Sequence, residues 1–372
     1  MIIDINLDEY IGVFMKILMI IPSLGSGGAE RVLSSLANDW IAKKKCNVEI
    51  VCLIESEDFY HIDERIKIHR LNYNPNGGLK FLNLIKLLLK LRNLINIVKP
   101  DLCFSFIRQS NIITLLASKG LKTKVVISER DSPKVEVSPL YAYLRKKLYP
   151  SCNGMIVQTH EYKSFVENQF GNIKQQVIPN PVRDISINNI KKENIIISVG
   201  RLIPSKGHKY LIEAFANCKY KNNWELVILG DGVLKEELMQ KAKTLGIEKK
   251  VKLIGATKKV DSWLCKSSIF AFTSVSEGFP NALAEAMSAS LPCISFDCIT
   301  GPKELIEDGH NGYLVNVGDI EHFTFRLDQL MQNEPLRKKV GVNAKKTANS
   351  LDFNKISELY FLFLVNVMRF DR

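Results

Sequence analysis

The segment from Ser274 to Leu291 limits the possible folds of this chain more than any other. It follows a short apolar run, residues 269–273, that is typical of a buried strand. The glycine and proline that come next indicate a turn, and from Ala282 onward the residues favour a helix. A strand, a glycine-containing loop and a helix N-terminus together form a common binding site for anionic ligands. Two carboxylates, Glu277 and Glu285, lie in this unit, although capping and the helix dipole alone explain a glutamate near a helix start.

The spacing of these two carboxylates carries a family resemblance. Seven residues separate Glu277 from Glu285, and Gly278-Phe279-Pro280 lies between them. This pattern resembles the E-x7-E signature of the retaining, nucleotide-sugar-dependent glycosyltransferases of family 4, and the resemblance extends from Lys16 to about Tyr360. It implies the α/β GT-B fold, in which two Rossmann-like domains with parallel sheets face each other across a cleft. It also implies that the last apolar helix, residues 356–368, packs back toward the N-terminal domain.

A division into two domains also agrees with the length of the chain, since 372 residues are enough for two hydrophobic cores. Two prolines bracket Asn180 and predict a stiff, extended exit from the first domain, as in the family's segment before the linker. We therefore expect an acceptor domain in residues 1–182 and a donor domain in residues 183–372. Met15 directly precedes the first strand pattern, so we expect residues 1–14 to be a peripheral extension and Met15 to be a candidate start.

Arg201 and Lys206 lie in a loop between a predicted strand, residues 195–200, and a predicted helix. Two cations at this position can clamp a diphosphate. A loop with two basic residues is more often only part of the surface. However, the string G-R-L-x-x-x-K-G resembles the family's loop that binds the donor pyrophosphate and stabilises the departing nucleotide. The resemblance thus makes Arg201, Lys206 and Glu277 the expected catalytic residues.

The resemblance also assigns the rest of the donor site. It implies that Glu285 accepts hydrogen bonds from the two ribose hydroxyls, while the backbone N–H groups of Gly278, Phe279 and Asn281 face the sugar and the β-phosphate. Gly230 and Lys258 complete the expected donor site.

Gly230 belongs to a Gly-Asp-Gly turn that comes near the nucleotide in relatives, although its glycines have an adequate structural reason alone. Lys258 belongs to the segment expected at the edge of the nucleobase. The sequence has no D-x-D pair, so we expect no metal ion and no other cofactor, only a nucleotide-sugar substrate.

A glycine-rich turn near the N-terminus is the candidate acceptor loop. Gly27 and Gly28 follow the first strand pattern and precede Glu30, and such glycines let backbone N–H groups approach a phosphate. Tight packing alone also explains such a turn. The string Gly-Gly-Ala-Glu-Arg resembles the family's loop opposite the donor. A dinucleotide site would require G-x-G-x-x-G, and Glu30 occupies the last position, which disfavours a dehydrogenase.

Two arginines after predicted strands are further acceptor candidates. Arg130 follows the strand at residues 124–128, at the end where ligand clefts open in α/β folds. Many relatives have a histidine near this point that touches the transferred sugar, whereas this chain has Glu129 and Arg130. An arginine here can hold an acceptor phosphate. Arg108, after the strand at residues 101–106, is a similar candidate.

We therefore expect transfer of a hexose or N-acetylhexosamine from a nucleotide sugar to a glycan. The resemblance alone implies retention at the anomeric carbon and favours UDP as the nucleotide. A glycosidase also uses two carboxylates, but hydrolysis gives the Arg201 and Lys206 pair no role. A GT-B sugar-nucleotide epimerase and a non-catalytic, membrane-associated carbohydrate-binding protein remain alternatives. No motif for nucleic-acid binding is present.

Charge and hydropathy patterns indicate where the protein acts. Residues 1–182 contain 24 Lys and Arg against 17 Asp and Glu, within a chain of net charge +12. Residues 79–98 predict a long helix with basic residues among leucines, which can be either a core helix or a membrane-surface helix, and Arg145 lies in a second basic and aromatic cluster. The eight cysteines are scattered, and neither a signal peptide nor a spanning helix is indicated. We expect a cytoplasmic protein, peripheral on the inner face of the membrane, with a polyprenyl-diphosphate-linked acceptor for surface polysaccharide.

Overall fold

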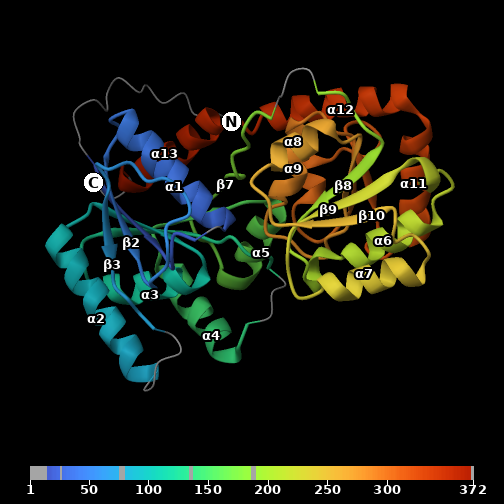
Figure 1. The fold of residues 1–372 in the computed structure, drawn as a ribbon. Coiled ribbons are helices and arrows are strands. Elements are labelled where there is room, and N and C mark those ends of the chain that lie inside the picture. The colour runs from blue at the N-terminus through green and yellow to red at the C-terminus, as the bar shows by residue number, and fades with distance from the viewer. Residues whose placement is uncertain (1–14, 26, 75–79, 134–136, 186–189, 370–372) are drawn as a thin grey trace.

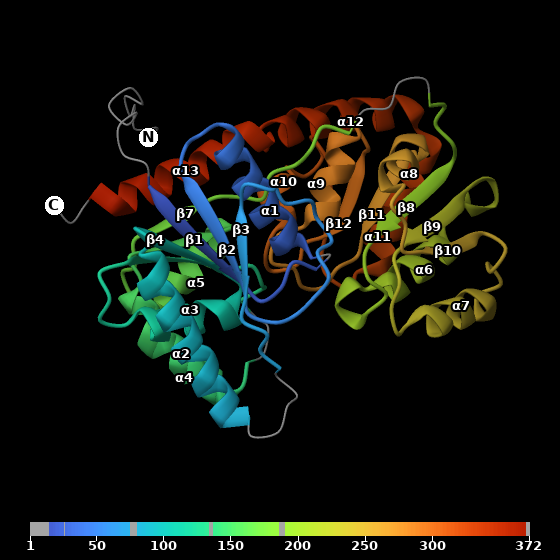
Figure 2. The same ribbon diagram turned by 60° about the vertical axis from the view of Figure 1, so that its left-hand side comes forward.

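The computed structural model describes residues 15–25, 27–74, 80–133, 137–185 and 190–369. In this part of the chain, two parallel sheets lie side by side, each with helices on both faces (Figures 1 and 2). The first sheet uses residues before the linker and the second uses residues after it. The predicted fold class, two Rossmann-like domains with parallel sheets, is therefore confirmed.

The first sheet has the strand order β3-β2-β1-β4-β5-β6-β7 among the described residues. Its strands are β1 (Lys16–Ile21), β2 (Asn47–Cys52), β3 (Lys67–Arg70), β4 (Leu102–Phe106), β5 (Lys124–Ser128), β6 (Gly154–Val157) and β7 (Gln175–Val177). Its helices are α1 (Gly28–Ala42), α2 (Lys80–Val98), α3 (Arg108–Ser118), α4 (Pro139–Leu148) and α5 (His160–Phe170), with a short 3-10 turn η2 (Tyr149–Ser151).

The second sheet has the order β10-β9-β8-β11-β12-β13 among the described residues. Its strands are β8 (Ile195–Val199), β9 (Glu225–Leu229), β10 (Val251–Gly255), β11 (Ile269–Phe272), β12 (Cys293–Phe296) and β13 (Tyr313–Val315). Its helices are α6 (His208–Asn217), α7 (Lys235–Thr244), α8 (Val260–Lys266), α9 (Asn281–Ser288), α10 (Pro302–Leu305), α11 (Ile320–Gln332) and α12 (Glu334–Asn349), with 3-10 turns η3 (Pro204–Lys206) and η4 (Lys221–Asn223).

The apolar runs of the sequence explain both sheets. Strands covered by helices on both faces are continuous hydrophobic runs, and every residue of β4 and of β11 is buried. The paired strands run parallel in each sheet, so their carboxyl ends meet at one edge, where α/β proteins bind ligands. The ends of β5, β8 and β11 lead into the loops that carry the predicted site residues.

The last helix returns to the first domain. After α12, which packs on α9, the chain continues into α13 (Phe353–Arg369), and Val182 and Asp352 lie side by side in an isolated bridge. Ile356, Tyr360 and Phe363 of α13 are buried in the core built on β1 and β4. Figure 2 shows α13 alongside the first sheet. The two crossings of the chain between the domains therefore lie together.

Most expected elements occur close to their predicted bounds. The predicted helix at residues 79–98 is α2, although residue 79 lies outside the described residues. Strand β7 was not predicted, because the sequence pattern there is dominated by the exit that follows it. Residues 1–14 also lie outside the described residues, and the boundary at residue 182 stays a prediction.

Candidate active site

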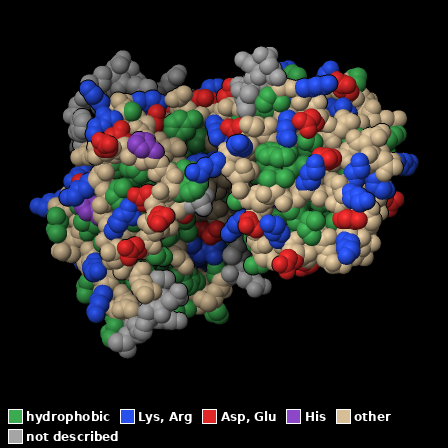
Figure 3. All heavy atoms as spheres, in the orientation of Figure 1, with side chains coloured by type: hydrophobic (Ala, Val, Ile, Leu, Met, Phe, Trp, Pro, Cys, Tyr) green, Lys and Arg blue, Asp and Glu red, His purple; other side chains and the backbone are tan. Residues whose placement is uncertain are grey.

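A hollow of about 740 Å³ lies between the two domains, and most of the predicted site residues line it. The surface is hollowed between the two halves of the molecule, with charged side chains visible around the depression (Figure 3). From the first domain the lining includes Gly27, Gly28, Glu30, Ile107, Arg130, Asp131, Ser132, Gln158 and Asn180. From the second domain it includes Arg201, Ser205, Lys206, Ser276, Glu277, Gly278, Phe279 and Asn281.

An ion pair joins the two donor-side loops. The Nζ of Lys206 donates to Oε1 of Glu277 at 2.6 Å, and the Glu277 side chain is only 9% exposed. The backbones are joined as well, because Val275 N–H donates to the Ser205 carbonyl at 2.9 Å, while Thr300 donates to the carbonyl of Glu277. Lys206 and Glu277, which lie 71 positions apart in the sequence, therefore form one ion pair on loops that are joined by backbone hydrogen bonds.

The loop after β8 needs two close approaches of backbone. A Cβ on Gly207, which has a φ of +62°, would come 2.1 Å from the Thr273 carbonyl. One on Gly230 would come 1.9 Å from the Gly200 carbonyl. Gly230 does not line the hollow. Its role in the structure is to let the ends of β9 and β8 lie side by side, next to the backbone of the exposed residue Arg201.

His208 lies beneath this loop at the start of α6. It is 4% exposed, and Nε2 lies 3.6 Å from the position that a Cβ on Gly200 would occupy. Burial lowers the pKa of His208 to about 4, and the charge of Lys206 acts in the same direction. The imidazole is therefore neutral near pH 7 and adds no positive charge below the loop that holds Arg201 and Lys206.

Helix α9 places its two predicted residues differently. Asn281 lines the hollow, but its N–H donates to the Phe279 carbonyl at 2.9 Å, so this group is already used within the loop. Its side chain accepts from Nδ2 of Asn180 in the other domain at 2.8 Å. Glu285 is not among the residues that line the hollow, since its Oε1 pairs with Nη1 of Arg31 from α1.

Gly278 lies at a close approach of the two domains. A Cβ on this residue would come 2.1 Å from the carbonyl of Arg130, so a side chain here would push the domains apart. Further contacts bridge the domains at α5, where His160 N–H donates to Glu304 at 2.6 Å and Lys303 pairs with Glu161 at 2.6 Å. The structure thus shows a closed arrangement with contacts on both sides of the hollow.

The acceptor loop residues lie opposite the donor loops. Gly27 precedes the first turn of α1, and a Cβ on it would come 2.1 Å from Oε2 of Glu30. Glu30 therefore folds back over its own loop. Burial raises the pKa of the Glu30 carboxyl, while its own backbone N–H and the charge of Arg130 lower it.

Arg130 lines the hollow, but protein groups already hold its guanidinium. Its Nε donates to Ser128 Oγ at 3.0 Å, Nη1 donates to Asn180, and Nη2 donates to the hydroxyl of Tyr360 at 3.0 Å. The guanidinium also stacks over Phe106, 4.8 Å from the ring centre. The expectation that Arg130 holds an acceptor phosphate therefore meets a guanidinium whose three nitrogens each already donate to a protein group, including the exit segment and α13.

Arg108 and Lys258 lie outside the hollow, in contrast to their predicted places. Arg108 is 8% exposed and contacts Asp131 at 3.4 Å and Glu129 at 3.9 Å. Glu129 also accepts from the hydroxyls of Tyr149 and Tyr162, so Arg108 belongs to a buried polar network. Lys258 is exposed in the turn after β10.

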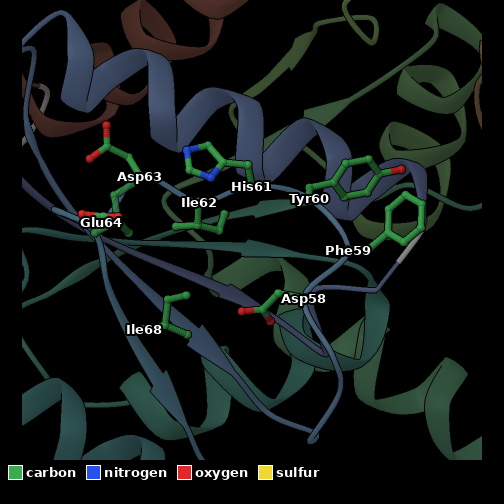
Figure 4. A pocket seen from close by; sticks show the side chains of 9 residues that line it. Asp58, Phe59, Tyr60, His61, Ile62, Asp63, Glu64 and Ile68 are labelled. Atoms are coloured by element: carbon green, nitrogen blue, oxygen red, sulfur yellow. The ribbon is translucent and has the colours of Figure 1, made fainter.

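A second hollow of about 460 Å³ belongs to the first domain alone. Asp58, Phe59, Tyr60, His61, Ile62, Asp63, Glu64, Ile66 and Ile68 line it, and Figure 4 shows them around the segment before β3. Two of its acids are paired, Asp58 with Arg70 and Asp63 with Arg65. No predicted site residue lies there, and the described residues contain no group of three or more metal-binding side chains.

Several residues of the hollow were not predicted. Gln158 and Asn180 form a hydrogen-bonded group with Arg130, and Tyr360 completes it from α13. Asn180 stood in the predicted exit segment, so its position was visible in the sequence but its contacts were not. In the sequence, Arg31 stood out only as the last residue of the Gly-Gly-Ala-Glu-Arg string, and no contact was predicted for it.

Comparison with known proteins identifies the family. A model described as "Glycosyltransferase Family 4" matches residues 26–184, and one described as "Glycosyl transferases group 1" matches residues 183–347. Two relatives, both from Campylobacter jejuni subsp. jejuni serotype O:2, match along nearly their whole lengths.

One is the N-acetylgalactosamine-N,N'-diacetylbacillosaminyl-diphospho-undecaprenol 4-alpha-N-acetylgalactosaminyltransferase, 35% identical over 92% of this chain and 97% of that protein. The other is the GalNAc-alpha-(1->4)-GalNAc-alpha-(1->3)-diNAcBac-PP-undecaprenol alpha-1,4-N-acetyl-D-galactosaminyltransferase, 31% identical over 95% of this chain and 99% of that protein. The crystal structure of TarM has the same fold, with a TM-score of 0.80 at 16% identity over 96% of this chain and 99% of that one. The chain belongs to glycosyltransferase family 4 and is a hexosyltransferase.

Proposed function

We propose that this hexosyltransferase moves a hexose or N-acetylhexosamine from a nucleotide sugar, with UDP favoured, to a lipid-linked glycan, with retention at the anomeric carbon. The observation that carries the proposal is the arrangement of Arg201, Lys206 and Glu277 on one wall of the hollow between the domains. A departing nucleoside diphosphate needs cations placed in advance where its charge develops. The two basic residues of the donor wall meet that need.

Each donor-side residue has a distinct role in this proposal. Arg201 and Lys206 neutralise the leaving diphosphate, and Glu277, held by Lys206, faces the transferred sugar. Glu285 accepts hydrogen bonds from the ribose hydroxyls. The donor phosphate assists deprotonation of the acceptor hydroxyl on the same face of the sugar, which gives retention. No divalent metal takes part in this scheme.

The acceptor class is supported by the names of the relatives. Both Campylobacter jejuni proteins are named as N-acetylgalactosaminyltransferases that act on undecaprenyl-diphosphate-linked glycans. Relatives named for amylovoran biosynthesis and for lipopolysaccharide galactosyl transfer match at 29% and 34% identity. These names support our proposal that this enzyme acts in the assembly of a surface polysaccharide on a polyprenyl diphosphate carrier.

An exposed apolar and basic surface on the first domain fits such an acceptor. On α2, Leu82 and Leu89 are 49% and 61% exposed and lie beside exposed Lys86 and Lys90. On α4, exposed Leu140 and Tyr143 accompany exposed Lys146 and Lys147. Helices with such faces lie on anionic bilayers.

Within the described residues, no helix is long and apolar enough to cross a membrane. We propose that the protein binds the cytoplasmic face of the membrane peripherally through this surface.

Vesicle co-sedimentation tests this membrane surface. Leu89→Glu should weaken binding to anionic vesicles by roughly tenfold to a hundredfold, since one buried leucine is worth roughly 1.5–3 kcal/mol. Leu245→Glu is the matched control, because Leu245 is exposed on the donor domain. If the two variants bind anionic vesicles equally well, α2 is not part of the membrane-binding surface.

Nucleotide release from a panel of UDP- and GDP-sugars, with and without lipid extract, tests the reaction. Release from one donor that requires lipid extract and is lost in Arg201→Ala and Glu285→Ala supports the proposal, and NMR of the product reports the anomeric configuration. Conversion of the donor sugar without an acceptor would indicate an epimerase. Tight donor binding without turnover under any condition would indicate a carbohydrate-binding protein.

A further inference from the structure

Arg31 and Glu285 form an ion pair between the two domains, and neither residue lines the hollow. Arg31 lies in the first turns of α1 and Glu285 lies in α9, 254 residues later, and Nη1 of the arginine donates to Oε1 of the carboxylate. The side chains are 29% and 10% exposed, so the carboxylate is the more shielded partner. Among the contacts that bridge the domains, this one involves a carboxylate of the E-x7-E signature.

The contact conflicts with the role proposed for Glu285. A ribose diol must donate hydrogen bonds to the carboxylate, yet one of its oxygens already accepts from a guanidinium. A charge-assisted bond in a shielded place is stronger than a neutral hydrogen bond. Each carboxylate oxygen has about two acceptor sites, so Arg31 competes with the ribose hydroxyls for the sites of Oε1.

We propose that Arg31 blocks the ribose-binding carboxylate of Glu285 in the donor-free enzyme and is displaced when the nucleotide binds. The proposal rests on the proposed function, because it takes Glu285 as the ribose acceptor. Since Arg31 belongs to the acceptor domain, its displacement removes one bond between the domains each time a donor enters. Donor binding is thereby coupled to the contact between the domains. When a site is occupied by a group of its own protein, its apparent Kd for a ligand is the intrinsic Kd divided by the fraction of time that the site is free.

A matched pair of variants separates this blocking role from a general effect of domain contacts. Arg31→Met removes the cation and keeps much of its length. Lys303→Met breaks another ion pair between the domains, from Lys303 to Glu161 at 2.6 Å, without touching Glu285. Thermal melting of both variants checks that each is folded, and Arg31→Lys serves as a second variant with an intact charge and shorter reach.

Calorimetric titration with UDP and with GDP measures the effect on the full-length protein. For the nucleotide that the wild type binds, Arg31→Met should tighten binding about tenfold while Lys303→Met stays within about twofold, as expected when only the first variant frees a blocked site. In a Glu285→Gln background, Arg31→Met should have no further effect, since the pair no longer exists.

Two contrary results have different meanings. If Glu285→Gln weakens nucleotide binding and Arg31→Met leaves it unchanged or weakens it, the blocking role is wrong and the proposed function stands. If folded wild type and Arg31→Met bind neither nucleotide, or if binding does not depend on Glu285, both the donor site and the inference drawn from it fail.

Discussion

The donor wall of the hollow has an exposed arginine beside an ion pair that lines the ligand space, whereas the arginine of the acceptor wall is held by protein groups. Arg201 is exposed and Lys206 pairs with Glu277 inside the hollow. On the opposite wall, Ser128, Asn180 and Tyr360 accept from the three guanidinium nitrogens of Arg130.

Arg108, further into the first domain, is buried beside two carboxylates. The arginines of the first domain therefore fix the frame of the cleft, and the cations of the second domain are placed to act on a diphosphate. We propose that other parts of the first domain recognise a charged acceptor, among them the exposed surface of α2 and α4.

The largest expected effect comes from the donor wall. Lys206→Met should lower kcat/KM for transfer by roughly a hundredfold to a thousandfold, since a charge placed for the transition state is worth that much. Lys209→Met is the control, because Lys209 is exposed on α6 and does not line the hollow. Steady-state kinetics with the active donor measures both. Similar activity of the two variants would mean that Lys206 only holds the loop.

The next effect concerns His208 under the donor loop. Its pKa in the folded protein, about 4, is below the ordinary value of 6.5. The unfolded chain therefore binds more protons between these values, so the stability that neutral His208 contributes is complete above pH 6.5 and is lost as the pH falls toward 4. The loss is about 3 kcal/mol at 1.36 kcal/mol for each pH unit.

Denaturant titrations across that pH range test this with His208→Gln. The difference in unfolding free energy between the wild type and the variant should shrink or change in favour of the variant as the pH falls from 6.5 to 4. A difference that is constant with pH would show that the folded protein protonates His208 as easily as the unfolded chain does.

A smaller effect is expected at the acceptor wall. Tyr360→Phe removes the hydroxyl that accepts from Arg130, and a hydrogen bond to a charged group contributes roughly 1.5–3 kcal/mol. We expect a loss of stability of about that size with little change in the kcat of the folded enzyme. Denaturant unfolding and kinetics on the same preparation measure the two. A large loss of kcat at unchanged stability would show that Arg130 acts on a substrate.

The same contrast explains what the sequence could predict. The donor residues lie close together in the sequence. Arg201 and Lys206 belong to one loop, and Glu277 and Glu285 belong to one strand–loop–helix unit. The acceptor wall depends on contacts between distant residues, such as that of Arg130 with Tyr360, 230 positions away. Periodicity reveals that α13 is apolar on one face but not which guanidinium its tyrosine reaches. The pairing of Glu285 with Arg31 is likewise a product of how the domains meet.

The most direct test of this account compares one arginine from each side. Arg201→Met should lower kcat/KM about a hundredfold or more while the melting temperature stays unchanged. Arg108→Met should lower the melting temperature, because it removes a buried cation from beside Glu129 and Asp131, and its folded fraction should keep a kcat/KM close to that of the wild type. The account would be contradicted if Arg108→Met lost activity at an unchanged melting temperature while Arg201→Met retained it.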